Sequence, residues 1–104
     1  MRKTYDKLVR DRIPEIIEAS GKQAVTRIAD DSEYEMYLKQ KLMEEVNEYL
    51  ASGNPEELAD IMEVVAALGQ ASGIKFEDLV MMAEKKRHSR GGFDSKIVLL
   101  HVDD

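Results

Sequence analysis

Apolar residues recur at helical spacing in two long stretches near the middle of the chain. From about residue 33 to 52 they fall three and four positions apart, which predicts a helix with one apolar face. That face comprises Leu38, Leu42, Val46, Tyr49 and Leu50. The second stretch, 54–72, is apolar almost all round between residues 61 and 71, which is typical of a helix buried on most sides.

Capping and turn residues mark the limits of both predicted helices. Ser32, followed by Glu35, has the spacing of a capping box and predicts the start of the first helix. Gly53 ends this helix, and Asn54 with Pro55 supplies the cap and the first position of the next. Because the link between the two helices is so short, they must form an antiparallel hairpin.

Two shorter helices are predicted beside the hairpin. Asp11 is expected to cap the first of them, with Pro14 in its first turn and its end at residues 20–21. The last helix is expected over residues 74–88, after a stop at Gly73. The side chains expected to point inward from it are Phe76, Leu79, Val80 and Ala83.

The remaining segments have weaker patterns. Residues 96–102 are β-branched and apolar and predict a strand, whose expected mate is the extended segment 7–10. Residues 22–32 are compatible with a strand or a loop. The fold class predicted from the whole pattern is all-α: a bundle of about four helices with a central acid-bearing hairpin, a minor strand pairing of the termini, and a single domain over residues 1–104.

Composition narrows the class of protein. A chain of 104 residues with 43% hydrophobic and 35% charged residues has the balance of a soluble globular domain. No apolar run approaches the roughly 20 residues of a membrane span, and the opening MRKTYDKLVRDR lacks the apolar core of a secretory signal. We therefore expect a cytoplasmic protein without a membrane partner. The absence of cysteine excludes disulfides and thiolate ligands, and two distant histidines argue against zinc.

Charge is unevenly distributed along the chain. A formal net charge of -6 argues against binding a nucleic-acid polymer, because phosphate backbones are held by a surplus of Lys and Arg. Local groups of cations near both termini suit a small polyphosphate ligand. The candidates are Arg10, Arg12, Lys85, Lys86, Arg87 and Arg90. The alternative is structural: cations in a last helical turn complement the helix dipole, and the N-terminal ones pair with surface acids.

Acidic residues border the apolar faces of the predicted hairpin. At about 100° per residue, Glu45 and Glu48 form one pair at i and i+3, and Glu57 and Asp60 form another. An antiparallel hairpin can bring both pairs together, where the carboxylates would repel one another and raise their pKa values. A divalent cation with a preference for oxygen would relieve the repulsion, which points to Mg²⁺, with Mn²⁺ as a substitute.

Structural explanations of the same acids remain open. The first helix, with Glu44 beside the other two, has the composition of an ordinary solvated acidic face. Glu57 stands three residues after Asn54, where a capping-box Glu belongs. Asp60 is the hardest to explain structurally, since it is a poor helix former set among apolar residues.

The acids occur in an order that matches a known family. Glu44-Glu45-Val46-Asn47-Glu48 followed by Glu57-Leu58-Ala59-Asp60 resembles the EExxE and ExxD motifs of MazG-like all-α nucleoside triphosphate pyrophosphohydrolases. KLMEEVNEYL and EELADIMEVVAAL are similar to that family in apolar spacing. KLVRDRIPEII and RGGF resemble a short stand-alone subgroup often labelled phosphoribosyl-ATP pyrophosphohydrolase-like. The resemblance runs from about Tyr5 to Leu100.

The resemblance implies a function. Members of this family hydrolyse a nucleoside triphosphate with Mg²⁺ to the monophosphate and pyrophosphate, a reaction that cleans the nucleotide pool. By motif position, the implied metal ligands are Glu45, Glu48, Glu57 and Asp60, and the implied catalytic residues are Glu44, Glu45 and Glu48. The family assembles as homodimers or homotetramers. The alternatives are hydrolysis of phosphoribosyl-ATP, or a non-catalytic helical dimerisation or nucleotide-binding module, which the apolar 61–71 stretch favours.

Overall fold

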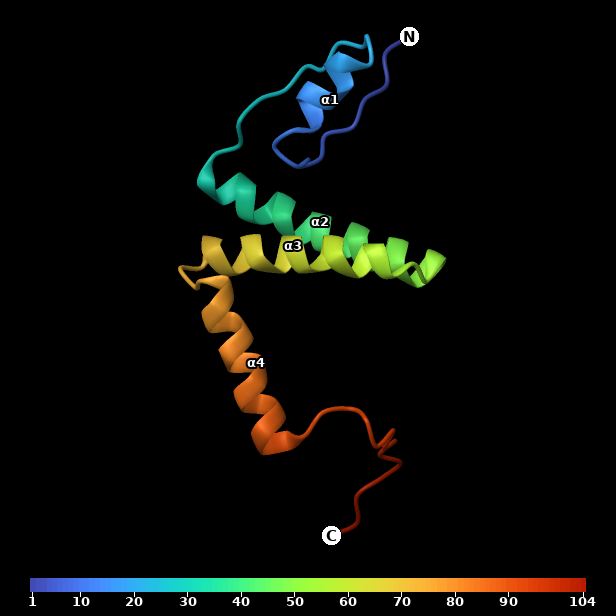
Figure 1. Ribbon diagram of the computed structural model, residues 1–104, viewed down its shortest axis with the longest axis vertical. Coiled ribbons are helices and arrows are strands. Elements are labelled where there is room, and N and C mark those ends of the chain that lie inside the picture. Colours follow the sequence, from blue (N-terminus) through green and yellow to red (C-terminus); the bar gives the residue numbers. More distant parts are fainter.

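Helices α2 (Asp31–Ser52) and α3 (Pro55–Ala71) form an antiparallel hairpin at the centre of the molecule (Figure 1). In this computed structural model, which describes all 104 residues, α1 (Ile13–Ala19) precedes the hairpin and α4 (Phe76–Arg90) follows it. Four helices and no strands confirm the all-α prediction. None of the helices combines the length and the apolar character that a bilayer crossing requires.

Helix α2 begins two residues earlier than predicted. Asp30 is its N-cap: the Asp30 side chain accepts the Glu33 N–H at 2.9 Å, and the Glu33 carboxylate accepts the Asp30 N–H at 3.2 Å. The predicted capping box of Ser32 and Glu35 is therefore wrong. The Asp30 and Glu33 pair has the same spacing and a charged acceptor, and Ser32 instead donates its hydroxyl to Asp30 at 3.3 Å.

The turn between α2 and α3 is as predicted. Gly53 adopts the left-handed conformation, with φ of 66°, which ends a helix at little cost only for glycine. Asn54 Oδ1 accepts the Glu56 N–H at 3.0 Å, and Pro55 is the first residue of α3. This cap fixes where the first turn of α3 stands relative to the middle of α2.

The end of α3 sets the direction of α4. Gly73 has a φ of 81°, the Ile74 N–H donates to Gly69 O at 2.8 Å, and the Gly73 N–H donates to Gln70 O at 3.0 Å. These two bonds make a Schellman motif and confirm the predicted stop at Gly73. A side chain at Gly69 would meet Ile74 O at 3.3 Å, so glycine permits the turn after α3 to fold back closely onto the helix.

The start of α1 and the conformation of both termini differ from the prediction. Arg12, not Asp11, is the N-cap of α1 and no side chain caps the helix, although Pro14 lies in its first turn as expected. Residues 96–102 form no strand, and 22–30 is a loop. The predicted pairing of the termini is wrong because the two ends of the chain lie at opposite ends of the molecule (Figure 1).

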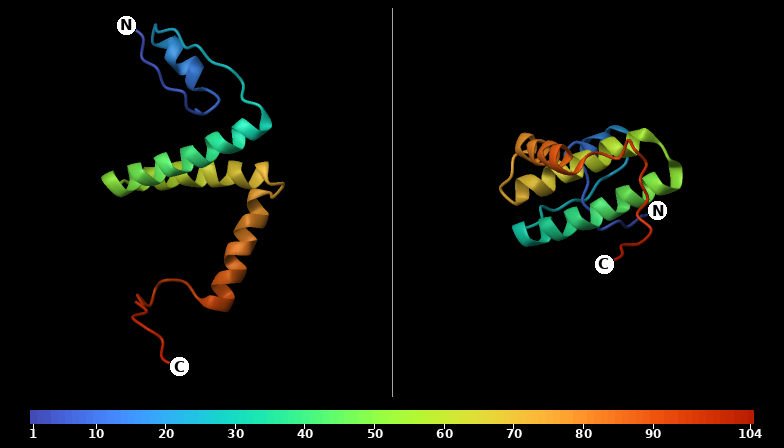
Figure 2. Two further views of the ribbon diagram at one scale, coloured as in Figure 1. Left: turned by 180° about the vertical axis from the view of Figure 1, so that it is seen from behind. Right: turned by 90° about the horizontal axis from the view of Figure 1, so that it is seen from below.

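One chain buries little of its apolar surface. Its radius of gyration is 18.3 Å, against about 13 Å expected for a compact domain of this length. Only Leu38, Val64 and Glu45 are buried. Helix α4 leaves the end of α3 and points away from the hairpin (Figure 1 and Figure 2), and the expected inward residues Phe76 and Val80 are exposed. The predicted helices are present, but only α2 and α3 pack along their lengths.

Candidate metal centre

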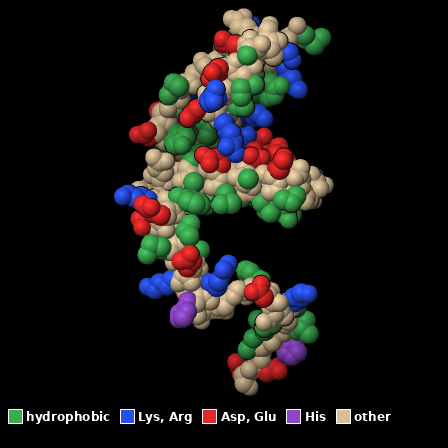
Figure 3. Space-filling view, in the orientation of Figure 1, with side chains coloured by type: hydrophobic (Ala, Val, Ile, Leu, Met, Phe, Trp, Pro, Cys, Tyr) green, Lys and Arg blue, Asp and Glu red, His purple; other side chains and the backbone are tan.

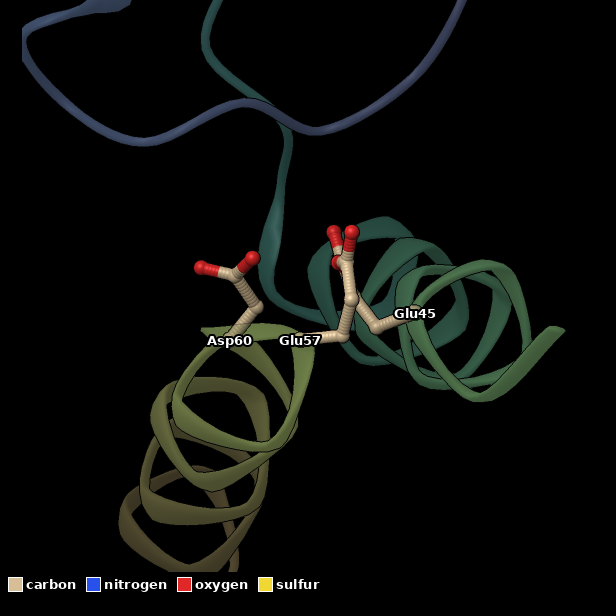
Figure 4. A group of neighbouring side chains, drawn as sticks. All are labelled: Glu45, Glu57 and Asp60. Atoms are coloured by element: carbon tan, nitrogen blue, oxygen red, sulfur yellow. The ribbon is translucent and has the colours of Figure 1, made fainter. Parts of the chain in front are cut away.

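Three carboxylates from the two hairpin helices converge on one place. Glu45 comes from the middle of α2, whereas Glu57 and Asp60 come from the first two turns of α3. One oxygen from each of the three lies within 4.8 Å of the others. Figure 4 shows the Glu45 and Glu57 side chains pointing to the same side of the hairpin, with Asp60 beside them. Three of the four predicted metal ligands are therefore brought together.

Glu45 is the buried member of this carboxylate group. The residue is only 7% exposed, and its Oε2 atom has no hydrogen-bond partner. Its Oε1 atom lies 3.4 Å from the Nζ of Lys41. Burial raises the pKa of the Glu45 carboxyl, and the charge of Glu48 raises it further, while Lys41 opposes the shift. A buried carboxylate oxygen without a partner is costly, and a cation would remove that cost.

Glu57 is held in a similar electrostatic environment. Loss of hydration raises the pKa of its carboxyl, followed by the charges of Glu48, Asp60 and Glu45. The capping-box explanation of Glu57 is not borne out, because Asn54 alone caps α3 and the Glu57 carboxylate turns toward the other acids (Figure 4). Glu57 therefore lies with the candidate ligands and has no side-chain role in the cap.

Glu48 lies beside the group but outside it. Its charge acts on Glu45 and Glu57, yet its side chain is exposed and none of its oxygens belongs to the set within 4.8 Å. Its role as a ligand stays a prediction. Glu44 is not in the set either, since its Oε1 atom pairs with the Nζ of Lys7 at 3.2 Å and of Lys41 at 3.6 Å.

The carboxylate group suits a hard divalent cation. Ligand oxygens on opposite sides of Mg²⁺ are about 4.2 Å apart, so oxygens within 4.8 Å of one another need only small side-chain movements to share an ion. Three carboxylates leave coordination positions for water or phosphate oxygens, which is how Mg²⁺ is usually held at phosphate sites. No cysteine exists and no histidine belongs to the group, which disfavours zinc.

Cations surround these acids without neutralising them. Arg10 Nη2 lies 2.7 Å from Asp60 Oδ1, while Lys7 and Lys41 contact the acids of α2. Figure 3 shows basic and acidic side chains meeting between the hairpin and the N-terminal part of the chain. Five carboxylates, counting Glu44 and Glu48, face these three cations, which leaves a formal excess of two negative charges. One divalent cation would balance it.

The predicted phosphate-binding cations divide into three sets. Arg10 lies at the acids, whereas Arg12 pairs with Glu15 of α1 at 3.4 Å. The other four belong to the last turns of α4, which point away from the start of α3 (Figure 1). Those four are Lys85, Lys86, Arg87 and Arg90. Within one chain they do not reach the carboxylates, and their role stays a prediction.

Two of the neighbouring cations, Lys41 and Lys7, were not among the predicted residues. Lys41 stands four residues before Glu45 on α2, so the i and i+4 rule could have found it. Lys7 contacts Glu44 across 37 positions of sequence, and no local spacing rule predicts such a pair.

The raised pKa values predict how pH affects the metal-free protein. Glu45 and Glu57 bind protons more tightly in the folded chain, so their protonation contributes stability that is fully present below the ordinary Glu pKa of about 4.3. That contribution is lost as pH rises through the raised folded pKa. The pKa values of Asp30 and Glu33 are lowered, so their contribution is present above the ordinary carboxyl pKa and is lost only in stronger acid.

Thermal unfolding in EDTA at pH 7.5 and at pH 4, just below the ordinary Glu pKa, checks this expectation. On acidification, the thermal stability of the Glu45→Gln variant should rise less than that of wild type, because the variant lacks one of the two carboxyls with a raised pKa. An identical pH response in both proteins would contradict it.

The fold and site together define a helical hairpin that carries a candidate divalent-cation centre. Over 45 residues the chain is 56% identical to an uncharacterized protein of Mycolicibacterium smegmatis (strain ATCC 700084 / mc(2)155). The matched stretch covers 43% of this chain and 46% of that protein, so the match spans less than half of either. No protein-family model and no solved structure matches the chain.

Proposed function

We propose that the protein is a Mg²⁺-dependent hydrolase that converts a nucleoside triphosphate, ribo or deoxyribo, to the monophosphate and pyrophosphate. The observation that carries this proposal is the buried Glu45 oxygen without a partner, set beside Glu57 and Asp60. The resemblance of the same acids to the EExxE and ExxD motifs supports the choice of chemistry. The reaction adds one water molecule across the anhydride bond between the α and β phosphates.

The acids of the centre have two kinds of role in this proposal, as metal ligands and in orienting water. Glu45, Glu57 and Asp60 would hold Mg²⁺, and exposed Glu48 stands close enough to join them. When bound, Mg²⁺ supplies charge neutralisation at the phosphates and lowers the pKa of a coordinated water. Glu44, fixed by Lys7 and Lys41, is the candidate to orient the attacking water. Positioning and charge stabilisation account for most catalysis in phosphoryl chemistry.

A panel of substrates tests the proposal. Purified protein with Mg²⁺ is incubated with the common ribo- and deoxyribonucleoside triphosphates and with phosphoribosyl-ATP, and the products are separated. At least one triphosphate should yield monophosphate and pyrophosphate in equal amounts. Cleavage of phosphoribosyl-ATP alone would shift the assignment to that reaction, and no pyrophosphate from any compound would favour a non-catalytic module.

We also propose that the protein works as a homo-oligomer of two or four chains. Large apolar side chains of α3 and α4 are left between 39% and 64% exposed in one chain. They are Leu58, Met62, Phe76, Val80, Met81 and Met82. Figure 3 shows hydrophobic side chains along the side of the hairpin opposite the acids. A second copy is the occupant we infer, because one chain alone stays far more extended than a compact domain.

Light scattering after size exclusion measures the oligomeric state directly. The expected mass is at least twice the 11.8 kDa of one chain. Replacing the apolar Met62 with Lys should lower that mass, whereas Glu63→Gln on the same helix should not. A wild-type mass of 11.8 kDa would contradict the proposal.

A further inference from the structure

The N-terminal segment, residues 5–12, brings its own cation to the candidate metal centre. Arg10 Nη2 donates a hydrogen bond of 2.7 Å to Asp60 Oδ1, and Asp60 is one of the three convergent carboxylates. Figure 4 shows the N-terminal chain passing across the side toward which the carboxylates point. The Arg10 guanidinium is therefore bound to a carboxylate that a divalent cation would also use as a ligand.

Besides the Arg10 bond, two polar contacts join this segment to the hairpin. The Tyr37 hydroxyl donates to Asp6 Oδ1 at 2.7 Å, and Lys7 pairs with Glu44 at 3.2 Å. Helix α1, which follows the segment, packs against no other helix. The segment can therefore shift relative to α3 without separating any packed helices.

Exposure to water limits the strength of the Arg10 contact. Both partners are well exposed, with 54% of the Arg10 side chain and 40% of the Asp60 side chain accessible. Exposed ion pairs contribute little to stability because water screens them. A divalent cation would gain from several carboxylates at once, including the unpartnered oxygen of Glu45. Arg10 would thus give up Asp60 when the cation is bound.

Once released, Arg10 is well suited to a phosphate. The bond to Asp60 is the only hydrogen bond its side chain makes, so the rest of its donor fork has no protein acceptor. Two other arginines near this segment are engaged elsewhere: Arg12 bonds to Glu15, and Arg27 bonds to both oxygens of Glu33. Arg10 alone combines a free fork with a place at the carboxylates.

We propose that Arg10 exchanges partners: it pairs with Asp60 in the metal-free protein and binds an oligophosphate oxygen once a divalent cation occupies the centre. This inference rests on the proposed function, because the oligophosphate is the substrate of that reaction. The consequence is a binding order in which the cation enters first and a phosphate-binding arginine becomes available only afterwards.

Two titrations on the full chain test this exchange with wild type, Arg10→Gln and Lys39→Gln, since Lys39 is an exposed cation of α2 that pairs with Glu35. The first measures Mn²⁺ binding by the loss of the free-ion electron spin resonance signal. Arg10→Gln should bind Mn²⁺ roughly 2- to 5-fold more tightly, the range expected for removal of an exposed competing ion pair. The second measures binding of inorganic tripolyphosphate in excess Mg²⁺ by calorimetry. There Arg10→Gln should bind roughly 10-fold or more weakly, since a charge-assisted hydrogen bond is lost.

The exchange requires that Arg10→Gln strengthens Mn²⁺ binding and weakens tripolyphosphate binding, and Lys39→Gln controls for the loss of one positive charge. If both variants behave alike in either titration, or if Arg10→Gln weakens Mn²⁺ binding, the exchange is overturned while the proposed function stands. If wild type binds no Mn²⁺, the metal centre and the exchange both fail. If tripolyphosphate does not bind wild type, the phosphate half of the exchange fails, and turnover in the substrate panel separately decides the proposed function.

Discussion

Replacing Asp60 with asparagine is expected to lower kcat/KM for the triphosphate substrate by roughly 10²–10³-fold, because removal of one group that stabilises charge at the reacting centre costs about 3–4 kcal/mol. Asparagine keeps the shape of Asp60 but removes the negative charge that the divalent cation and Arg10 both use. Folding should persist, since the lost Arg10 pair is exposed and contributes at most about 1 kcal/mol. Steady-state kinetics with the triphosphate that responds in the panel measures the effect.

Glu63→Gln is the matched control for Asp60→Asn. Glu63 lies on the same helix, is exposed, and does not belong to the carboxylate group, so its neutralisation removes an equal charge away from the centre. It should keep nearly all the activity. Equal losses in the two variants, with both still folded, would assign the effect to the net charge of α3 and contradict the metal centre.

Removal of the divalent cation is expected to destabilise the wild-type fold strongly. A ligand at 100 times its dissociation constant adds about 2.7 kcal/mol to the native state. For a chain of this size, 1 kcal/mol corresponds to about 4–8 °C in Tm. Saturating Mg²⁺ should therefore raise Tm by roughly 10 °C or more over EDTA, partly because it offsets the loss of hydration and the repulsion that together raise the pKa values of Glu45 and Glu57.

Adjacent residues on α3 provide the control for this thermal shift. Glu57→Gln should lose most of the Mg²⁺-dependent rise in Tm, whereas Glu56→Gln should keep it, because Glu56 is exposed and lies outside the carboxylate group. Circular dichroism at 222 nm follows both transitions. A rise of the same size in Glu57→Gln would show that the cation stabilises the fold from another place.

Local sequence rules predicted the hairpin because its determinants are local. Gly53 and Asn54 fix the turn through their own backbone and side chain, so their neighbours suffice to identify it. The start of α2 was misplaced because Asp30 with Glu33, and Ser32 with Glu35, offer the same spacing. Sequence alone does not decide between two overlapping capping boxes. In the structure, the charged side chain of Asp30 caps the helix.

Long-range features were predicted less well. The pairing of the two termini rested on β propensity alone, and α4 carries residues 91–104 away from the N-terminal end (Figure 1). The inward face assigned to Phe76 and Val80 assumed that one chain closes its own bundle, which it does not. Periodicity shows that a helix has an apolar face but does not say which chain covers it.

The identity of the candidate site residues was predicted better than their arrangement in space. Helical spacing placed Glu45, Glu57 and Asp60 near the core, and the structure brings these three together. The same spacing treated Glu48 as their equal, although it is exposed, because an angle about a helix axis does not fix the direction of a long side chain. The Arg10 contact joins residues 50 positions apart, beyond the reach of any periodicity.

A titration of wild type, Glu45→Gln and Glu63→Gln with Mn²⁺, followed by the free-ion electron spin resonance signal, tests the central claim most directly. Saturable binding is expected in wild type and Glu63→Gln, together with its loss in Glu45→Gln, because the glutamine amide carries no negative charge and offers only one oxygen. Circular dichroism of the variant confirms that the helices persist. Saturable binding of equal strength in all three proteins, or its absence from wild type, would contradict a divalent-cation centre at Glu45, Glu57 and Asp60.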